Sequence, residues 1–146
     1  MGSIAITNGT LVDGAGTRRA DLLIQNGVIA EVGEKLDGDT IIDADGLVVT
    51  PGFVDLQVHF REPGGEEAET IQTGSRGAAL GGFTAVVVMP NTKPTIDSAA
   101  VVRQIHDLSI DALCEVVPSA AITVDRDGEA LAPMAELVRS GVRLFT

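Results

Sequence analysis

The sequence predicts an α/β protein in two parts: a β-rich segment over residues 1–50, then the first four βα units of a (β/α) barrel over residues 51–146. Three observations support this fold class. Turn-forming Asn-Gly and Asp-Gly pairs separate short apolar runs in the first part, whereas β-branched runs alternate with helical patterns in the second. The change between the two patterns falls at Pro51-Gly52. Strict alternation of strand and helix indicates parallel strands with right-handed crossovers.

The first segment is predicted to form short strands joined by hairpin turns. Its apolar or alternating runs are SIAIT, LLIQ, VIAEV and GLVVT. Asn-Gly and Asp-Gly favour the positive φ angles that two-residue hairpin turns require. The pairs that separate these runs are Asn8-Gly9, Asn26-Gly27 and Asp45-Gly46.

The second segment is predicted to alternate strands and helices. Its apolar runs are FVDLQVHF, FTAVVVMP, LCEVVPSAA and VRLFT. The helical patterns between them lie within 66–80, within 98–109 and near 133–140. A closed barrel of this kind has eight strands, so four units are expected to form half of one and to leave unpaired edges.

The second and third of these helices each carry an apolar stripe that is predicted to pack on the sheet. In the second helix Asp97 or Ser98 is placed to cap the start, and the stripe consists of Val101, Val102, Ile105 and Leu108. In the third helix Pro133 lies near the first turn and Gly141 is the predicted stop. The stripe of the third helix consists of Leu131, Met134, Leu137 and Val138.

Composition argues against several classes of function. The chain has 10 Lys and Arg against 21 Asp and Glu, and its net charge of −11 repels phosphate backbones and anionic headgroups. We therefore expect no nucleic-acid partner and no membrane. Cys114 is the one cysteine, so no internal disulfide can form, as suits a reducing cytoplasm. No basic leader and no stretch of about 18 apolar residues is present, so a cytoplasmic protein is predicted.

Polar side chains converge near the end of the first predicted barrel strand. Alternation along FVDLQVHFR directs Asp55, Gln57, His59 and Arg61 to one side. Two ligands at i and i+2 lie about 7 Å apart and can reach one metal ion. Imidazole suits zinc, whereas the neutral amide oxygen of Gln57 is a weak substitute. The alternative is that His59 is simply a hydrogen-bonded histidine at a strand end.

Four motifs together resemble the dihydroorotase family of the amidohydrolase superfamily, especially its bacterial class I branch. They are VDLQVHFREPG at 54–64, ET at 69–70, GGFTAVVVMPNTKP at 81–94 and DS at 97–98. The resemblance implies a zinc-dependent hydrolase of pyrimidine biosynthesis that interconverts dihydroorotate and carbamoyl-aspartate. It also implies that residues 1–50 belong to the small β-sandwich flanking the family's (β/α)8 barrel, and that 51–146 form the first half of that barrel.

The resemblance assigns roles only where motifs match. The family's strand ends in H-x-H; His59 matches the second histidine as a metal ligand, and Gln57 takes the place of the first. Arg61 and Asn91 match residues that bind the substrate carboxylate, for which the guanidinium fork is suited. Without the resemblance, Arg61 would be interpreted as a solvated cation and Asn91 as a turn residue.

No residue of this chain matches the catalytic aspartate of the family. Family members follow the Phe145-Thr146 pattern with a metal-binding aspartate, and neither Lys35 nor Lys93 is placed for the carbamylated lysine of other branches. We therefore expect the isolated chain to have no appreciable hydrolase activity. An alternative is a non-catalytic scaffold for aspartate transcarbamoylase, a role that inactive dihydroorotase homologues have. Both hypotheses predict self-association or pairing with a complementing C-terminal half, because half a barrel exposes strand edges.

Overall fold

The computed structural model describes residues 2–146 and divides the chain into two compact units, one ending at Pro51 and the other beginning at Gly52. No helix within residues 2–146 combines the length and the apolar character needed to cross a membrane.

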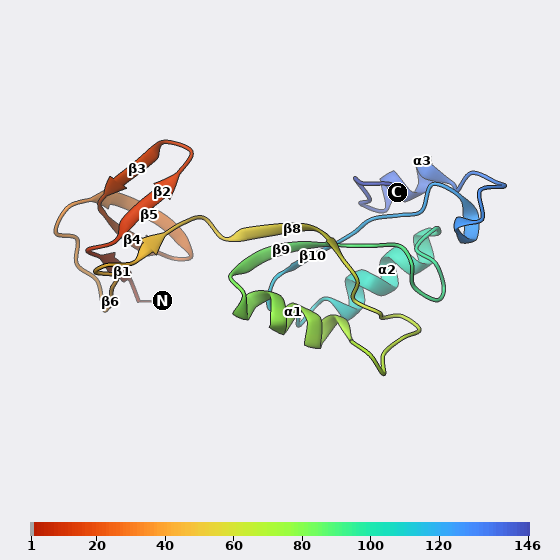
Figure 1. Cartoon of the computed structure of the whole chain (residues 1–146), viewed down its shortest axis with the longest axis horizontal. Helices are drawn as coiled ribbons and strands as arrows, with labels where there is room; N and C mark the ends of the chain where they lie inside the picture. The colour runs from red at the N-terminus through yellow and green to blue at the C-terminus, as the bar shows by residue number, and fades with distance from the viewer. Residues whose placement is uncertain (1) are drawn as a thin grey trace. The chain divides into compact units, whose positions relative to one another are not determined.

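The first unit consists of two small sheets (Figure 1). One sheet has the strand order β5 (Val28–Gly33), β4 (Asp21–Gln25), β1 (Ile4–Thr7) and β6 (Thr40–Asp43). The other has the order β3 (Gly16–Arg19), β2 (Thr10–Asp13) and β7 (Val48–Val49). The pairs β1–β6 and β2–β7 are parallel, and the remaining pairs are antiparallel.

Only one of the three predicted turns is a hairpin. Asn26-Gly27, at φ 52° and 79°, joins the antiparallel neighbours β4 and β5. Asn8-Gly9 and Asp45-Gly46 instead connect strands that belong to different sheets, so the hairpin prediction is wrong at both. Their positive φ values supply a sharp turn, but a local turn signal does not specify which strand the chain will pair with next.

A hairpin that was not predicted joins β2 and β3. Asp13 accepts the Ala15 N–H at 2.8 Å within the turn, and both of its carboxylate oxygens lie 2.9 Å from the Arg18 guanidinium. The bidentate bond and the turn bond together lower the pKa of Asp13, with the Arg18 contact as the larger cause. These contacts close a hairpin at the Asp13-Gly14 pair, a turn signal that the predicted hairpins do not include.

The second unit has a parallel three-stranded sheet in the order β10 (Glu115–Pro118), β9 (Phe83–Val88) and β8 (Phe53–Val58). The helices are α1 (Ile71–Leu80), α2 (Ala99–Leu108) and α3 (Met134–Arg139), with a 3-10 turn η1 (Val124–Arg126). Figure 1 shows α1 and α2 on one side of this sheet. The predicted fourth strand is reduced to a single parallel bridge between Ala120 and Phe145.

The first helix begins at a reciprocal side-chain cap, and the second begins without a side-chain cap. At α1, Thr70 Oγ1 accepts the Thr73 N–H at 3.1 Å and Thr73 Oγ1 accepts the Thr70 N–H at 3.0 Å, which forms a reciprocal cap. Ser98 occupies the N-cap position of α2 without a side-chain cap bond. The expected capping by Ser98 therefore fails, although the helix starts where it was predicted.

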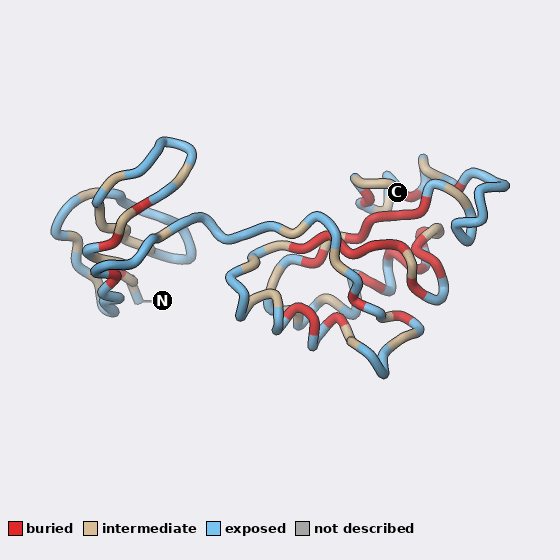
Figure 2. Tube along the Cα trace, in the orientation of Figure 1, coloured by how far each residue is buried: buried red, intermediate tan, exposed pale blue. Residues whose placement is uncertain are grey.

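The apolar core of the second unit lies between the sheet and its helices. Figure 2 shows buried chain along β9 and the facing sides of α1 and α2. Val101, Val102 and Ile105 are buried as predicted, whereas Leu108, the fourth member of the predicted stripe, is exposed. The core cluster comprises Phe60, Ile71, Val86, Val88, Ile96, Val101, Val102, Ile105, Val116, Ala120, Ala132, Leu137 and Val142.

The predicted stripe of α3 is mostly wrong. Leu137 is fully buried, but Leu131 lies outside the helix and is 73% exposed, and Val138 is also exposed. The helix is only six residues long and has one buried residue, Leu137. It is too short to bury the longer apolar stripe that the periodicity predicts. Gly141, at φ 105°, follows the helix as the predicted stop.

Candidate functional site

An irregular stretch of β8 determines which side chains share a face. The register of β8 against β9 shifts between Asp55 and Val58, where three steps along β8 match two along β9. The Asp55 carboxylate accepts the Gln57 N–H at 2.9 Å inside this bulge. Asp55 lines a cavity with Val58, His59 and Phe60. The predicted grouping of Asp55 with His59 therefore holds, whereas Gln57 lines a different cavity and strict alternation fails.

Gln57 and His59 line a cavity of about 400 Å³, which we call the His59 cavity. It lies where β8 and β9 end and where the chain continues beyond β10, the edge of a parallel sheet at which ligands bind in many α/β proteins. Its walls are formed by Gln57, His59, Met89, Pro90, Asn91, Ile122, Thr123, Arg126 and Thr146. Three of the four predicted site residues therefore meet here.

The imidazole of His59 is held by Asn91. The Nδ1 atom lies 2.9 Å from Asn91 Oδ1, and because a carboxamide oxygen only accepts, Nδ1 donates. In the neutral ring this leaves the Nε2 lone pair free, which is the tautomer of a histidine that binds a metal or accepts a proton through Nε2. The Asn91 amide nitrogen remains available to donate to a ligand.

Arg61, the fourth predicted site residue, lines a separate depression of about 140 Å³, the Arg61 cavity. Its walls are Arg61, Gly64, Gly65, Glu67, Ala68, Asn91, Thr92 and Lys93. Asn91 lines both cavities. The structure therefore brings Arg61 beside Asn91 rather than into the His59 cavity itself.

The loop that carries Arg61 is fixed by two glutamates. Glu62 accepts the N–H of Ile71 at 2.7 Å, at the start of α1, and Glu66 accepts the Gly64 N–H at 2.8 Å. The backbone bond from Gly64 is the first cause of a lowered pKa at Glu66. Gly64 has φ 92°, and a Cβ there would collide with the Lys93 carbonyl. Glycine is thus required where the two strand-end loops approach each other.

Sequence reasoning missed Arg126, which lines the His59 cavity. This arginine is about 60 residues from the strand-end motif in the sequence and lies in the charged run VDRDGE, which is typical of a solvated loop. Asp125 and Arg126 both have left-handed backbones, at φ 51° and 63°. To predict this loop, the sequence would have had to indicate two successive residues with left-handed backbone, and neither Asp125 nor Arg126 is a glycine.

His59 and Gln57 each carry an atom that can bind zinc. His59 Nε2 and the Gln57 amide oxygen are two donors on one cavity wall. Among residues 2–146, no cluster of three or more His, Cys, Asp or Glu side chains is placed to hold a metal ion. A catalytic zinc takes three protein ligands and a water or substrate, so the described donors fit a zinc ion in part and do not complete its coordination.

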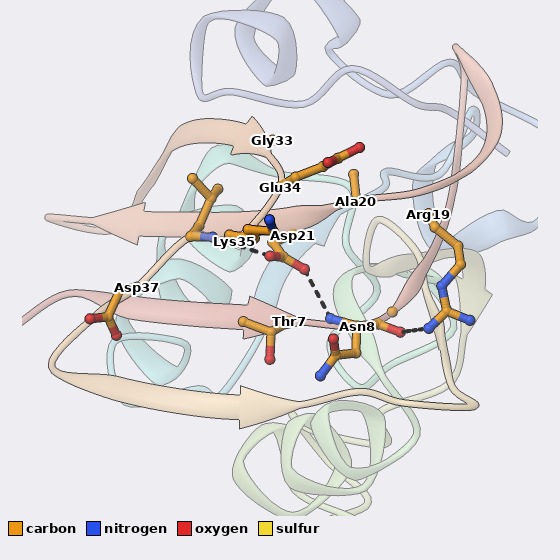
Figure 3. A pocket seen from close by; sticks show the side chains of 11 residues that line it. Thr7, Asn8, Arg19, Ala20, Asp21, Gly33, Glu34, Lys35 and Asp37 are labelled. Carbon is orange, nitrogen blue, oxygen red and sulfur yellow. Dashed lines mark hydrogen bonds between the residues drawn. The ribbon is translucent and has the colours of Figure 1, made fainter.

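A larger cavity of about 570 Å³ lies within the first unit (Figure 3). Its central carboxylate, Asp21, accepts the Asn8 N–H at 2.9 Å and the Leu36 N–H at 3.2 Å, and Arg19 donates to the Asn8 carbonyl at 2.8 Å. Backbone bonds, that from Asn8 first, lower the pKa of Asp21. Asp21 and Arg19 thus bond to the unit's own backbone and hold its loops together.

The sequence of this chain is similar to the sequences of dihydroorotases. A sequence profile described as Dihydro-orotase-like matches residues 46–146. A dihydroorotase of Caldanaerobacter subterraneus subsp. tengcongensis is 46% identical over 143 residues, which are 95% of this chain and 33% of that protein. A dihydroorotase of Citrifermentans bemidjiense is 50% identical over 125 residues, covering 83% of this chain and 30% of that protein. The chain therefore spans about a third of the length of the curated relatives it matches.

Similar solved structures include two hydantoinases. An L-hydantoinase from Arthrobacter aurescens superposes with a TM-score of 0.81 at 22% identity, covering 99% of this chain and 32% of the other. A D-hydantoinase from a Bacillus species superposes with a TM-score of 0.76 at 27% identity, covering 97% and 32%. The fold is thus shared with enzymes that have other names, whereas the higher sequence identities are to dihydroorotases.

Proposed function

The chain belongs to the dihydroorotase-like family, and we propose that it supplies one part of a cytoplasmic cyclic amidohydrolase that interconverts dihydroorotate and carbamoyl-aspartate in pyrimidine biosynthesis. The observation that carries the proposal is the His59–Asn91 hydrogen bond of 2.9 Å at the wall of the His59 cavity. It joins the end of β8 to the end of β9 through residues from two separate family motifs.

Arg61 and Asn91 are the proposed substrate-binding residues. Asn91 Oδ1 accepts from His59, so the Asn91 amide nitrogen is the group left to donate to a carboxylate. Arg61 stands next to Asn91 across the Arg61 cavity and presents a fork that fits a carboxylate in two parallel bonds. A ring carboxylate held by both residues would direct the rest of the ring toward His59.

His59, and more weakly Gln57, are the proposed zinc ligands of this chain. When bound, the zinc would polarise the ring amide and supply a hydroxide near neutral pH. His59 would present Nε2 to it, with Asn91 keeping the proton on Nδ1. Neutral Gln57 contributes less than imidazole to such a site, so the described residues alone are expected to bind zinc weakly.

We further propose that the second unit is half of a (β/α)8 barrel and that residues 1–50 are part of a β-sandwich. The parallel order β10-β9-β8 and the TM-score of 0.81 to a hydantoinase support this arrangement. In the described structure β8 is an edge strand, and its side chain Leu56 is 63% exposed, with Phe53 and Val54 also exposed. Such an edge would pair with a further strand, from a second copy or from a complementing C-terminal half.

An activity measurement tests the proposal. The purified 146-residue chain, supplied with zinc and dihydroorotate, is expected to show no turnover above a metal-only blank. Adding a polypeptide that corresponds to the remaining two thirds of a family member is expected to restore turnover. Restoration should depend on His59, so His59→Ala should abolish it while His106→Ala, on the exposed side of α2, should not. Failure of every such complement to restore turnover would count against the enzyme proposal.

A second candidate is a non-catalytic scaffold for aspartate transcarbamoylase, and Gln57 is the observation that favours it. A neutral amide in place of an imidazole ligand weakens a zinc centre, a loss that a scaffold tolerates. Co-purification separates the two candidates: a stable complex with a transcarbamoylase that persists in the His59→Ala variant, without zinc, would favour the scaffold. Zinc uptake and restored turnover would favour the enzyme.

A further inference from the structure

The two cavities that meet at Asn91 each contain an arginine. Arg126 lines the His59 cavity, and Arg61 lines the Arg61 cavity, whose walls also include Lys93 and Glu67. No Asp or Glu is among the residues that line the His59 cavity, although the whole chain carries a net charge of −11. The cavity therefore has a cationic side chain and no opposing carboxylate on its walls, which favours an anion there.

The guanidinium of Arg126 is not used by the fold. Within the part of the chain that the structure describes, the ion pairs are Arg18–Asp13 and Arg19–Asp45, and Arg126 takes part in neither. A structural role would have shown itself as an ion pair or a packed stem, but Arg126 is exposed. Its charge is thus free to meet a ligand.

Arg126 lies in a strained stretch of backbone. Asp125 and Arg126 both lie in the left-handed region, at φ 51° and 63°, a conformation that non-glycine residues pay for. Neighbouring bonds hold it: Asp97 Oδ2 accepts the Asp125 N–H at 2.8 Å, and the Val124 N–H donates to the Ala130 carbonyl at 2.9 Å. Strain that the surroundings maintain is often found where a side chain must be aimed at a ligand.

Two arginines on adjoining cavities fit a ligand with two carboxylates. Dihydroorotate has one carboxylate, whereas its ring-opened form has two. Water adds to the ring amide carbonyl and the C–N bond breaks; the nitrogen gains one proton of the water to become a terminal NH2 group, and the new carboxylic acid releases the other proton to solvent. We infer that Arg126 binds the second carboxylate, the one that exists only in the ring-opened compound, while Arg61 and Asn91 bind the first. The identity of this ligand rests on the proposed function.

Calorimetric titration of the 146-residue chain with carbamoyl-aspartate, dihydroorotate and succinate tests the inference. Succinate carries two carboxylates and no pyrimidine chemistry. Arg126→Gln should bind carbamoyl-aspartate and succinate about fivefold more weakly, because an exposed charge pair contributes about 1 kcal/mol, and should bind dihydroorotate within about twofold of the wild type. Arg103→Gln, at an exposed position of α2, is the matched control and should bind all three as the wild type does.

A second variant separates a binding role from a folding role. Arg126→Gly removes the guanidinium and suits the left-handed backbone, so its unfolding temperature should be no lower than that of the wild type while its affinity falls as in Arg126→Gln. Unchanged affinities in both variants, or equal losses for dihydroorotate and carbamoyl-aspartate, would overturn the role of Arg126. Arg126-dependent binding of succinate alone would keep the anion site and defeat the proposed function. Binding of none of the three compounds would overturn the Arg126 site, while the proposed function is decided separately by the complementation assay.

Discussion

His59 Nδ1 lies 2.9 Å from Asn91 Oδ1, so one hydrogen bond joins residues that are 32 positions apart and lie at the ends of two neighbouring parallel strands. The bond sets which ring nitrogen carries the proton. It also engages one end of the Asn91 amide and leaves the other end free.

The tautomer of His59 should depend on Asn91. In the wild type at a pH where the ring is neutral, Nδ1 is expected to be protonated because Asn91 Oδ1 accepts only. Asn91→Leu removes the acceptor at similar volume, so the Nε2-protonated form should gain population. Two-bond ¹H–¹⁵N correlation spectra report the tautomer, and His106, the other histidine, is an internal control that should not change. An Nε2-protonated His59 in the wild type would contradict the geometry.

Gln57→His should raise zinc affinity. The replacement puts a second imidazole beside His59 on the wall of the His59 cavity, and imidazole is a better zinc ligand than a neutral amide. A gain of about tenfold or more, or about 1.4 kcal/mol, is expected from competition with a chromogenic chelator.

Gln72→His is the matched control for this experiment. It adds an imidazole at an exposed position of α1 and should leave zinc affinity near that of the wild type. Equal gains in both variants would show that any added histidine suffices, and that Gln57 has no particular place at a metal site.

Gly74→Ala should destabilise the second unit. A Cβ at this position of α1 would collide with the Phe60 ring, and overpacking of this kind costs about 1–3 kcal/mol. The control is Gly77→Ala on the same helix, where a Cβ meets nothing within 4 Å. That substitution should instead stabilise the helix, by up to about 1 kcal/mol. Denaturant unfolding followed by circular dichroism measures both, and destabilisation by the two variants alike would refute the close packing of α1 on Phe60.

Acid should weaken the first unit through Asp21. Hydrogen bonds from the backbone, that of Asn8 first, lower the folded-state pKa of Asp21 below its usual value of 3.8. A depressed folded pKa contributes stability that is present above pH 3.8 and is lost as the pH falls through the lower folded value. Asp21→Asn should therefore be less stable than the wild type near pH 7, and the difference should shrink below pH 3.8.

Asp37→Asn is the control for the acid experiment. Asp37 lines the same cavity and accepts the N–H of the adjacent Gly38 at 2.8 Å, so its loss should disturb no contact between distant segments. Thermal unfolding across a pH series measures both variants. A difference between Asp21→Asn and wild type that is constant with pH would contradict the assigned cause.

The sequence predicted the elements of the second unit better than those of the first. The three parallel strands were predicted correctly because runs of β-branched residues indicate buried strands. Helix α2 was predicted correctly because Val101, Val102 and Ile105 recur at helical spacing and are buried. In the first unit, strand pairing is decided by distant segments: β6 pairs with β1 some 36 residues away. An Asp-Gly or Asn-Gly pair indicates a turn but does not indicate which distant strand the next strand will pair with.

For the candidate site, the sequence motifs singled out Gln57, His59 and Asn91. The structure places all three on the walls of one cavity. Asp55 and Gln57 line different cavities because the register shift between Asp55 and Val58 breaks alternation, and no side-chain pattern in VDLQV marks this shift. Arg126 was missed because its position depends on left-handed backbone at two residues that are not glycine. Sequence patterns indicate periodic burial well and irregular backbone poorly.

The two irregularities in β8 cancel each other. Phe53 faces Phe83 and Val58 faces Val88, so both strands advance by the same number of residues between these pairs although the pairing slips twice within the interval. Deleting the exposed Leu56 would remove one slip and leave the other, which would displace either the start of β8 or its end, with His59, by one position against β9. The length of this short stretch is therefore part of what positions the imidazole.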